Sequence, residues 1–76
     1  DKKLLITGHT DSDGADALNQ RLSESRAKQT KSFLLKEGFK ASQLTTEGKG
    51  EKEPIAPNDT PDGKAKNRRS TVRLQE

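Results

Sequence analysis

The chain has no cysteine among its 76 residues, and its only Phe, Tyr or Trp side chains are Phe33 and Phe39. The absence of cysteine excludes a disulfide framework and a thiolate metal site. The scarcity of aromatic rings leaves no platform on which nucleic-acid bases could stack, and both phenylalanines are better explained as core residues. We therefore expect no nucleic-acid partner.

Long apolar runs and a strongly one-sided charge are also lacking. No segment is long enough to span a bilayer and no secretory signal is present, so we expect no direct membrane insertion. The net charge of +3 is mild for a chain with 36% charged residues. Only the segment from Lys64 to Arg73 is basic with no acid in it, and such a cluster suits carboxylates, phosphates or an acidic partner.

The apolar residues are few but grouped. Thirteen of the 76 residues are Leu, Ile, Val or Phe, which is under the fraction of about 20% below which disorder is suspected. These residues form short runs separated by turn signals, the pattern of a small mixed α/β unit. We expect one domain over residues 1–76 with a thin core. Because the chain begins at Asp1 rather than Met and enters a strand almost at once, we expect it to be a piece of a longer protein.

The first two thirds of the chain predict a strand, a long helix and a second strand. Residues 3–8 form a compact apolar run closed by Gly, and alternation of their side chains predicts a strand covered on both faces. A helix is expected over about 15–37, capped by Asp13 or its neighbours and ended by Gly38. A strand at about 43–48 then pairs parallel to the first, through a right-handed crossover.

The last third predicts a short helix and a third strand. Thr60 as N-cap and Pro61 in the first turn predict a helix that ends near Asn67, and we read the glycosylation-like Asn-Asp-Thr sequence there as this cap. Residues 70–74 alternate as a strand whose two apolar residues are expected on the covered face. The sum is an α/β (α+β, sandwich-like) fragment with a three-stranded sheet, one long helix and one short helix. Such a unit is marginal alone.

A polar loop and the helix that follows it hold the residues of most interest. Asn19, Leu22 and Arg26 fall at i, i+3 and i+7 and so are expected to share one helix face. An amide and a guanidinium on the inward side of a small helix need polar partners, because a buried unpaired charge is expensive. The obvious partners are Thr10 and Asp11 in the preceding loop, or a ligand that this loop helps to hold.

Other readings of the polar motifs are weaker. His9, Asp11 and Ser12 suggest a hydrolase, but neighbouring residues on an extended loop point in different directions and no G-x-S-x-G elbow is present. Residues 11–16 imitate a calcium loop in which Gly comes too early. The glycines at 48–50 lack the spacing of a phosphate-binding loop and are expected in a turn. We therefore expect no enzyme activity, metal or cofactor.

The Arg68-Arg69 pair enters the last strand. Consecutive residues of a strand point to opposite faces, so we expect one of the two to be a solvated charge while the other reaches a pocket.

Several spaced motifs together resemble the OmpA-like C-terminal domain. This is the peptidoglycan-binding module of outer-membrane porins, peptidoglycan-associated lipoproteins and flagellar stator proteins of the MotB type. The motifs are G-H-T-D at 8–11, L-S-x-x-R-A at 22–27, G-x-G-E at 48–51 and N-R-R at 67–69, within a resemblance that spans about residues 4–74. It implies a mixed sheet whose last strand is antiparallel, and a first strand and helix of the family lying before Asp1. The last strand would then be an exposed edge, through which a homodimer can form.

The resemblance implies a non-catalytic, periplasmic domain that anchors an envelope protein to the cell wall. In the family, the module binds the free diaminopimelate end of the peptidoglycan stem peptide, which places Asp11 against the ligand's ammonium and Arg26 against its carboxylate. The remaining pocket residues are Thr10, Asn19, Leu22 and Arg68. A zwitterion needs an anion and a forked cation a fixed distance apart. We therefore expect Asp11 and Arg26 to stand apart instead of closing a salt bridge.

One departure from the family pattern leaves an alternative open. Lys49 occupies a position where the family often has an aromatic residue, which removes an apolar cover. The alternative is a degenerate module that keeps the fold and acts as a protein-interaction or assembly domain in the envelope, with its basic C-terminal segment meeting an acidic partner.

Overall fold

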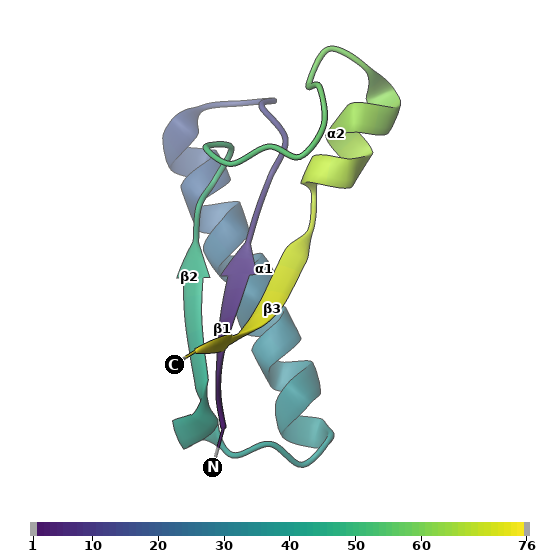
Figure 1. Ribbon diagram of the computed structural model, residues 1–76. Helices are drawn as coiled ribbons and strands as arrows, with labels where there is room; N and C mark the ends of the chain where they lie inside the picture. The colour runs from purple at the N-terminus through teal and green to yellow at the C-terminus, as the bar shows by residue number, and fades with distance from the viewer. Residues whose placement is uncertain (1, 76) are drawn as a thin grey trace.

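The computed structural model describes residues 2–75 and has two layers, with one long helix packed behind a three-stranded sheet (Figure 1). The elements in chain order are β1 Lys3–Gly8, α1 Asp16–Lys36, the 3₁₀ turn η1 Ala41–Gln43, β2 Leu44–Gly48, α2 Pro61–Asn67 and β3 Ser70–Gln75. These bounds agree with the expected elements to within one or two residues, apart from the unpredicted η1 turn. The α/β class is confirmed.

The sheet is mixed, and β1 is its central strand. The strand order is β2-β1-β3, with β2 parallel and β3 antiparallel to β1 (Figure 1). The parallel crossover and the antiparallel last strand are both confirmed. Among the described strands β3 has a partner on one side only, so it forms an edge of the sheet.

The core is thin and lies on one side of the sheet. It consists of Ile6, Ala27 and Leu44, with Leu4 and Leu34 packed against them. In the described chain no helix covers the opposite face, so the expected cover of β1 on that side does not come from a second helix (Figure 1). Polar side chains close that face instead. Thr7, for example, is 4% exposed there and its Oγ1 donates to Glu47 Oε1 at 3.0 Å.

The two apolar residues of β3 are much less covered than expected. Register places Val72 beside Ile6 and Leu74 beside Leu4, on the side of the sheet that α1 occupies. Yet their exposed fractions are 45% and 51%. The predicted alternation is correct, but α1 packs mainly over β1 and β2 and leaves the β3 side open.

The ends of α1 follow one expected rule and break another. Gly38, at φ +105°, lies just beyond the helix, and the Phe39 N–H donates to the Leu34 carbonyl at 3.1 Å. This is the expected C-terminal cap. At the other end Ala15 is the N-cap residue and no side chain caps the helix, so the expected cap by Asp13 is wrong.

The short helix α2 anchors the loop that precedes it. The Thr60 side chain accepts from the Gly63 N–H at 3.0 Å, which confirms the predicted cap. Asn67 is fully buried at the end of α2, where its Oδ1 accepts from the Ile55 N–H at 2.8 Å and its Nδ2 donates to the Ala56 carbonyl at 2.9 Å. The irregular segment is thereby fastened to the helix that leads into β3.

Two glycines at the ends of neighbouring strands determine how closely α1 approaches the sheet. Gly8 and Gly48 are register partners in β1 and β2. A Cβ added at Gly8 would lie 1.8 Å from the Ser23 carbonyl oxygen, and one added at Gly48 would lie 2.4 Å from Ser23 Oγ. Only glycine fits at such separations, so the first half of α1 rests on the two strand ends, beside the loop that follows β1.

Candidate functional site

The loop after β1 is held in place from two sides. The His9 N–H donates to the Arg69 carbonyl at 2.7 Å, and the Thr10 N–H donates to the Gly50 carbonyl at 2.9 Å. Thr10 Oγ1 donates to the Asp11 carbonyl at 2.9 Å. All three loop residues are buried, with exposed fractions between 3% and 7%. The sequence thus places a short polar loop, rigidly fixed, at the carboxyl end of the central strand.

Arg26 reaches this loop from α1. Its Nη1 donates to the His9 carbonyl at 2.5 Å. Within residues 2–75 its side chain makes no ion pair with Asp11 or with any other acid. A guanidinium has five N–H donors, and the His9 carbonyl uses one of them. The two charges predicted to stand apart are therefore not paired with each other.

Asp11 is paired with a different arginine from the one in the helix. Its Oδ2 accepts from Arg68 Nη1 at 2.6 Å and its Oδ1 accepts from the Asp13 N–H at 3.0 Å. Burial alone would raise the pKa of Asp11, but the Asp13 N–H and the Arg68 guanidinium, with Lys64 farther away, outweigh it and hold that pKa below its usual value. The carboxylate is therefore ionised at neutral pH.

The prediction that one of Arg68 and Arg69 is a solvated charge while the other reaches a pocket needs correction. Arg68 pairs with Asp11, whereas Arg69 turns to the opposite side and donates to the Glu53 carbonyl at 3.0 Å and to the Asn67 carbonyl at 3.4 Å. The two side chains do point to opposite faces, as strand geometry requires. Neither is a simple solvated charge.

The buried face of α1 differs from the predicted one. Its buried residues are Asn19, Ser23 and Ala27, at i, i+4 and i+8. Leu22 is 44% exposed, so it flanks this face and does not belong to it. Asn19 is buried as expected, and its Nδ2 donates to Glu51 Oε1 at 3.1 Å.

Sequence reasoning missed Ser23, which connects the helix to the second loop. Its side chain is fully buried, its Oγ accepts from the Gly50 N–H at 2.9 Å and donates to the Gln20 carbonyl at 2.8 Å. The available signal was the pair of small residues four apart, Ser23 and Ala27, opposite glycines at two strand ends. Small residues facing glycines indicate close backbone packing.

The structure thus gathers four of the six predicted residues around one loop: Thr10, Asp11, Arg26 and Arg68. Asn19 joins them through the turn at Gly50 and Glu51, and Leu22 stays outside. The described residues include no group of three or more His, Asp or Glu side chains able to hold a metal ion. Nor does any helix in residues 2–75 have the length and apolar character to cross a membrane.

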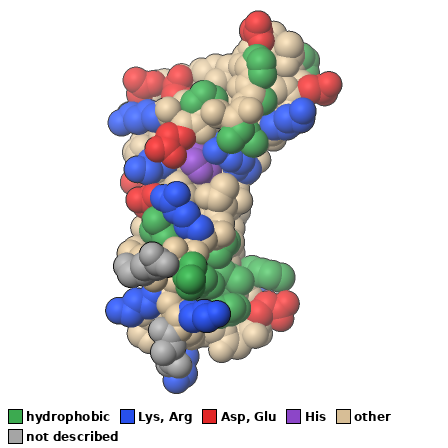
Figure 2. Space-filling view, in the orientation of Figure 1, with side chains coloured by type: hydrophobic (Ala, Val, Ile, Leu, Met, Phe, Trp, Pro, Cys, Tyr) green, Lys and Arg blue, Asp and Glu red, His purple; other side chains and the backbone are tan. Residues whose placement is uncertain are grey.

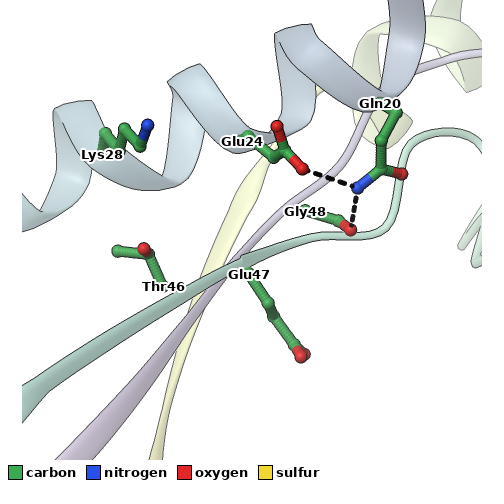
Figure 3. Close-up of a pocket in the computed structure, with 6 residues that line it drawn as sticks. All are labelled: Gln20, Glu24, Lys28, Thr46, Glu47 and Gly48. Atoms are coloured by element: carbon green, nitrogen blue, oxygen red, sulfur yellow. Dashed lines mark hydrogen bonds between the residues drawn. The ribbon is translucent and has the colours of Figure 1, made fainter. Parts of the chain in front are cut away.

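A hollow of about 460 Å³ lies elsewhere, between α1 and the outer edge of β2 (Figure 3). It is lined by Gln20, Glu24, Lys28, Thr46, Glu47 and Gly48. Gln20 Nε2 donates to the Gly48 carbonyl at 2.7 Å and to Glu24 Oε2 at 3.1 Å (Figure 3). None of the predicted site residues lines this hollow, so it is separate from the loop site.

Comparison with known proteins agrees with this arrangement. Residues 1–68 match the OmpA family. The chain belongs to the OmpA family. The loop site therefore lies on an OmpA-family domain, built from the G-H-T-D loop, α1 and the N-R-R motif.

Relatives of this OmpA-family chain are much longer proteins. Photosystem I P700 chlorophyll a apoprotein A2 of Gloeobacter violaceus is 49% identical over an aligned length of 76 residues. The match covers 92% of this chain and 9% of that protein. Outer membrane protein A of Bordetella avium is 42% identical over 71 residues, which cover 93% of this chain and 37% of that protein. The chain spans well under half the length of either relative, so the similarity concerns only a part of each.

A solved structure shares the fold of this OmpA-family chain. The peptidoglycan-associated lipoprotein of Burkholderia pseudomallei superposes with a TM-score of 0.93 at 28% identity. The match covers 97% of this chain and 63% of that structure. The OmpA-like expectation from the motifs is confirmed.

Proposed function

We propose that this OmpA-family domain binds peptidoglycan non-covalently through the diaminopimelate of the stem peptide, and so anchors its parent protein to the cell wall. The names of an outer membrane protein and a peptidoglycan-associated lipoprotein among its relatives support a periplasmic place in the cell envelope. Binding of this kind makes and breaks no covalent bond, so the proposal needs neither a nucleophile nor a cofactor.

One observation carries the proposal: Asp11 lies in the fixed loop and Arg26 donates to the His9 carbonyl of the same loop, but the two side chains are not paired with each other. The free end of diaminopimelate carries an ammonium and a carboxylate on one carbon. Asp11 accepts the ammonium and Arg26 donates to the carboxylate through the N–H groups that the His9 carbonyl leaves free. We assign Thr10 and Asn19 to the same pocket, and Arg68 orients Asp11 through their ion pair.

The expected affinity of a single domain is low. Charge-assisted hydrogen bonds contribute about 1.5–3 kcal/mol each, and ordering the stem peptide subtracts from their sum. The wall presents many stem peptides, so several copies of the parent protein raise the effective affinity without new contacts.

Co-sedimentation with purified sacculi that contain diaminopimelate tests the proposal. Wild type is expected in the pellet, and Arg26→Ala in the supernatant. Arg21→Ala is the matched control, because Arg21 is an exposed arginine on the same helix, outside the loop site. Free diaminopimelate should release wild type. Equal sedimentation of wild type and Arg26→Ala would overturn the proposal. Capture of an envelope protein without any retention by sacculi would favour the assembly-domain alternative.

A further inference from the structure

We propose that the sheet face opposite α1 carries a second binding site, for a small oxyanion such as a carboxylate or a phosphate, between Arg69 and Arg73. This site is independent of the proposed peptidoglycan site. Its residues come from the outward side of β1 and β3 and from the loop before α2.

Strand register brings the site together. On β1 and β3, Thr7 faces Thr71 and Leu5 faces Arg73. The same antiparallel pairing continues beyond the strands, where the His9 N–H donates to the Arg69 carbonyl at 2.7 Å. Alternation therefore puts His9, Thr7, Thr71 and both arginines on one face.

A hollow occupies this face. Its volume is about 250 Å³, and it is lined by Thr7, His9, Glu53, Arg69, Thr71 and Arg73. Figure 2 shows the face, with the single histidine set between basic and acidic side chains. The loop site and this hollow share no lining residue except His9, whose backbone serves the first and whose ring serves the second.

His9 contributes the observation that points to a ligand. It is 97% buried, since its exposed fraction is 3%, and its Nδ1 has no hydrogen-bond partner in the described part of the chain. A buried polar atom without a hydrogen-bond partner is destabilising. Burial first, and the Arg69 charge second, lower the pKa of His9, while Glu53 and Glu47 oppose this. The ring is therefore neutral at pH 7, with one N–H donor and one acceptor nitrogen.

The two arginines form no ion pair within residues 2–75, and because Glu53 is the one carboxylate among the lining residues, the hollow keeps a net positive charge. Arg69 donates only to the backbone carbonyls of Glu53 and Asn67, and Arg73 makes no hydrogen bond or ion pair with any residue in 2–75. The nearby Glu47 carboxylate is already engaged with Thr7. Forked guanidinium groups beside threonine hydroxyls suit a planar or tetrahedral oxyanion.

The spacing fits a small anion. Arg69 and Arg73 are four residues apart on one strand face, which places their Cα atoms about 13 Å apart at about 3.3 Å per residue. Both side chains line the hollow beside Thr71, so one small anion placed there can contact both. A ligand that bridges them also covers His9, which lines the same hollow.

Titration followed by ¹⁵N NMR tests the proposal. Wild type is titrated with sodium phosphate and separately with N-acetylglutamate, at ionic strength held constant with chloride. We expect saturable shifts at the His9 ring nitrogens and the Thr71 amide. The probe with the lower Kd shows whether phosphate or carboxylate is the preferred source of the anion.

A variant and a matched control make the test decisive. Arg73→Gln keeps the fold, because Arg73 holds no described partner, and should weaken binding about tenfold, the loss expected for one charge-assisted bond. Arg21→Gln, the same change on exposed α1, should bind as wild type does. Arg73→Gln should still sediment with sacculi as wild type does, which separates this site from the loop site. Absence of the shifts, or an equal response in Arg73→Gln and Arg21→Gln, would overturn the proposal.

Discussion

Arg68 and Asp11, 57 positions apart in the sequence, form an ion pair with 2.6 Å between Nη1 and Oδ2. The contact joins the end of α2 to the loop after β1, and so makes the C-terminal N-R-R motif part of the N-terminal site. A carboxylate has about four acceptor positions. Arg68 and the Asp13 N–H use one each, so Asp11 keeps acceptor capacity for an ammonium while Arg68 determines its orientation.

Arg68→Ala should raise the pKa of Asp11, because it removes a cation that favours the carboxylate form. Since the Arg68 side chain is 46% exposed, the change should cost under about 1 kcal/mol of folding free energy. NMR titration of the Asp11 carboxyl carbon measures the shift. Arg21→Ala should leave that titration unchanged, and an unaltered Asp11 midpoint in Arg68→Ala would show that the ion pair does not form in solution.

Gly8→Ala should destabilise the protein by about 4 kcal/mol or more, at the severe end for single substitutions. The added Cβ would meet a backbone oxygen of Ser23 at 1.8 Å, and a backbone atom cannot move without shifting α1. Urea denaturation followed by circular dichroism measures the loss. Gly38→Ala is the comparison, because that site has open space around it and only the strain of φ +105°, about 1–3 kcal/mol. A Gly8→Ala protein as stable as Gly38→Ala would contradict the close packing.

Acidification should lower stability in two stages. His9 has a lowered pKa in the fold, so the unfolded chain binds its proton more readily, and stability is lost as pH falls below the ordinary value of 6.5. The pKa of Asp11 is also lowered in the fold, so its contribution to stability is lost as pH falls below the ordinary value of 3.8. Urea denaturation between pH 8 and pH 3 follows the trend. The His9 ring should titrate below 6.5 in the fold and near 6.5 in urea, and a folded midpoint above the unfolded one would refute the sign.

Asn67→Ala should cost about 2 kcal/mol or more, because it leaves buried backbone groups of the preceding loop unsatisfied. Asn67 accepts from the Ile55 and Ala56 N–H groups and donates to the Ala56 carbonyl and to Asn58 Oδ1. Asn58→Ala removes one of these bonds and should cost less. Thermal unfolding of both variants gives the comparison, and equal losses would contradict the role of Asn67 as the anchor.

A homodimer through the β3 edge is a further expectation. Among the described strands, β3 pairs with another strand along one edge only. Its residues Val72 and Leu74 are about half exposed. Sedimentation equilibrium should show concentration-dependent association of this chain, and Leu74→Lys should abolish it. Leu18→Lys, which replaces a similarly exposed Leu on α1, is the control. A monomer at all concentrations would refute the expectation.

The sequence predicted the elements well because their signals are local. Alternation in β1 and β3, the Gly38 stop and the Thr60 cap each act within a few residues, and each lies where expected. The face of α1 was predicted less well. Its burial depends on how near Gly8 and Gly48 let the helix come, and that distance is a property of three segments together.

The contacts among the expected site residues could not be predicted from the sequence. The resemblance grouped Thr10, Asp11, Asn19 and Arg26 as one expected site; in the structure Arg26 contacts the loop that holds Thr10 and Asp11, whereas Asn19 contacts Glu51. The resemblance did not show that Arg68 would pair with Asp11, since side-chain pairing over such a separation in sequence depends on where α2 ends. The exposure of Val72 and Leu74 likewise depends on how far α1 extends over the sheet, which no local sequence pattern indicates.

The Gln20 side chain that caps the Gly48 carbonyl has a consequence for assembly. A strand arriving at the outer edge of β2 would compete with this amide for the Gly48 carbonyl, whereas no side chain within residues 2–75 hydrogen-bonds to the backbone of β3. The two rims of the sheet are thus unequal, and head-to-tail stacking, which uses both, is disfavoured. Association through β3 alone joins like to like about a twofold axis and stops at two copies. We therefore expect this glutamine to favour a closed pair over an open-ended fibre.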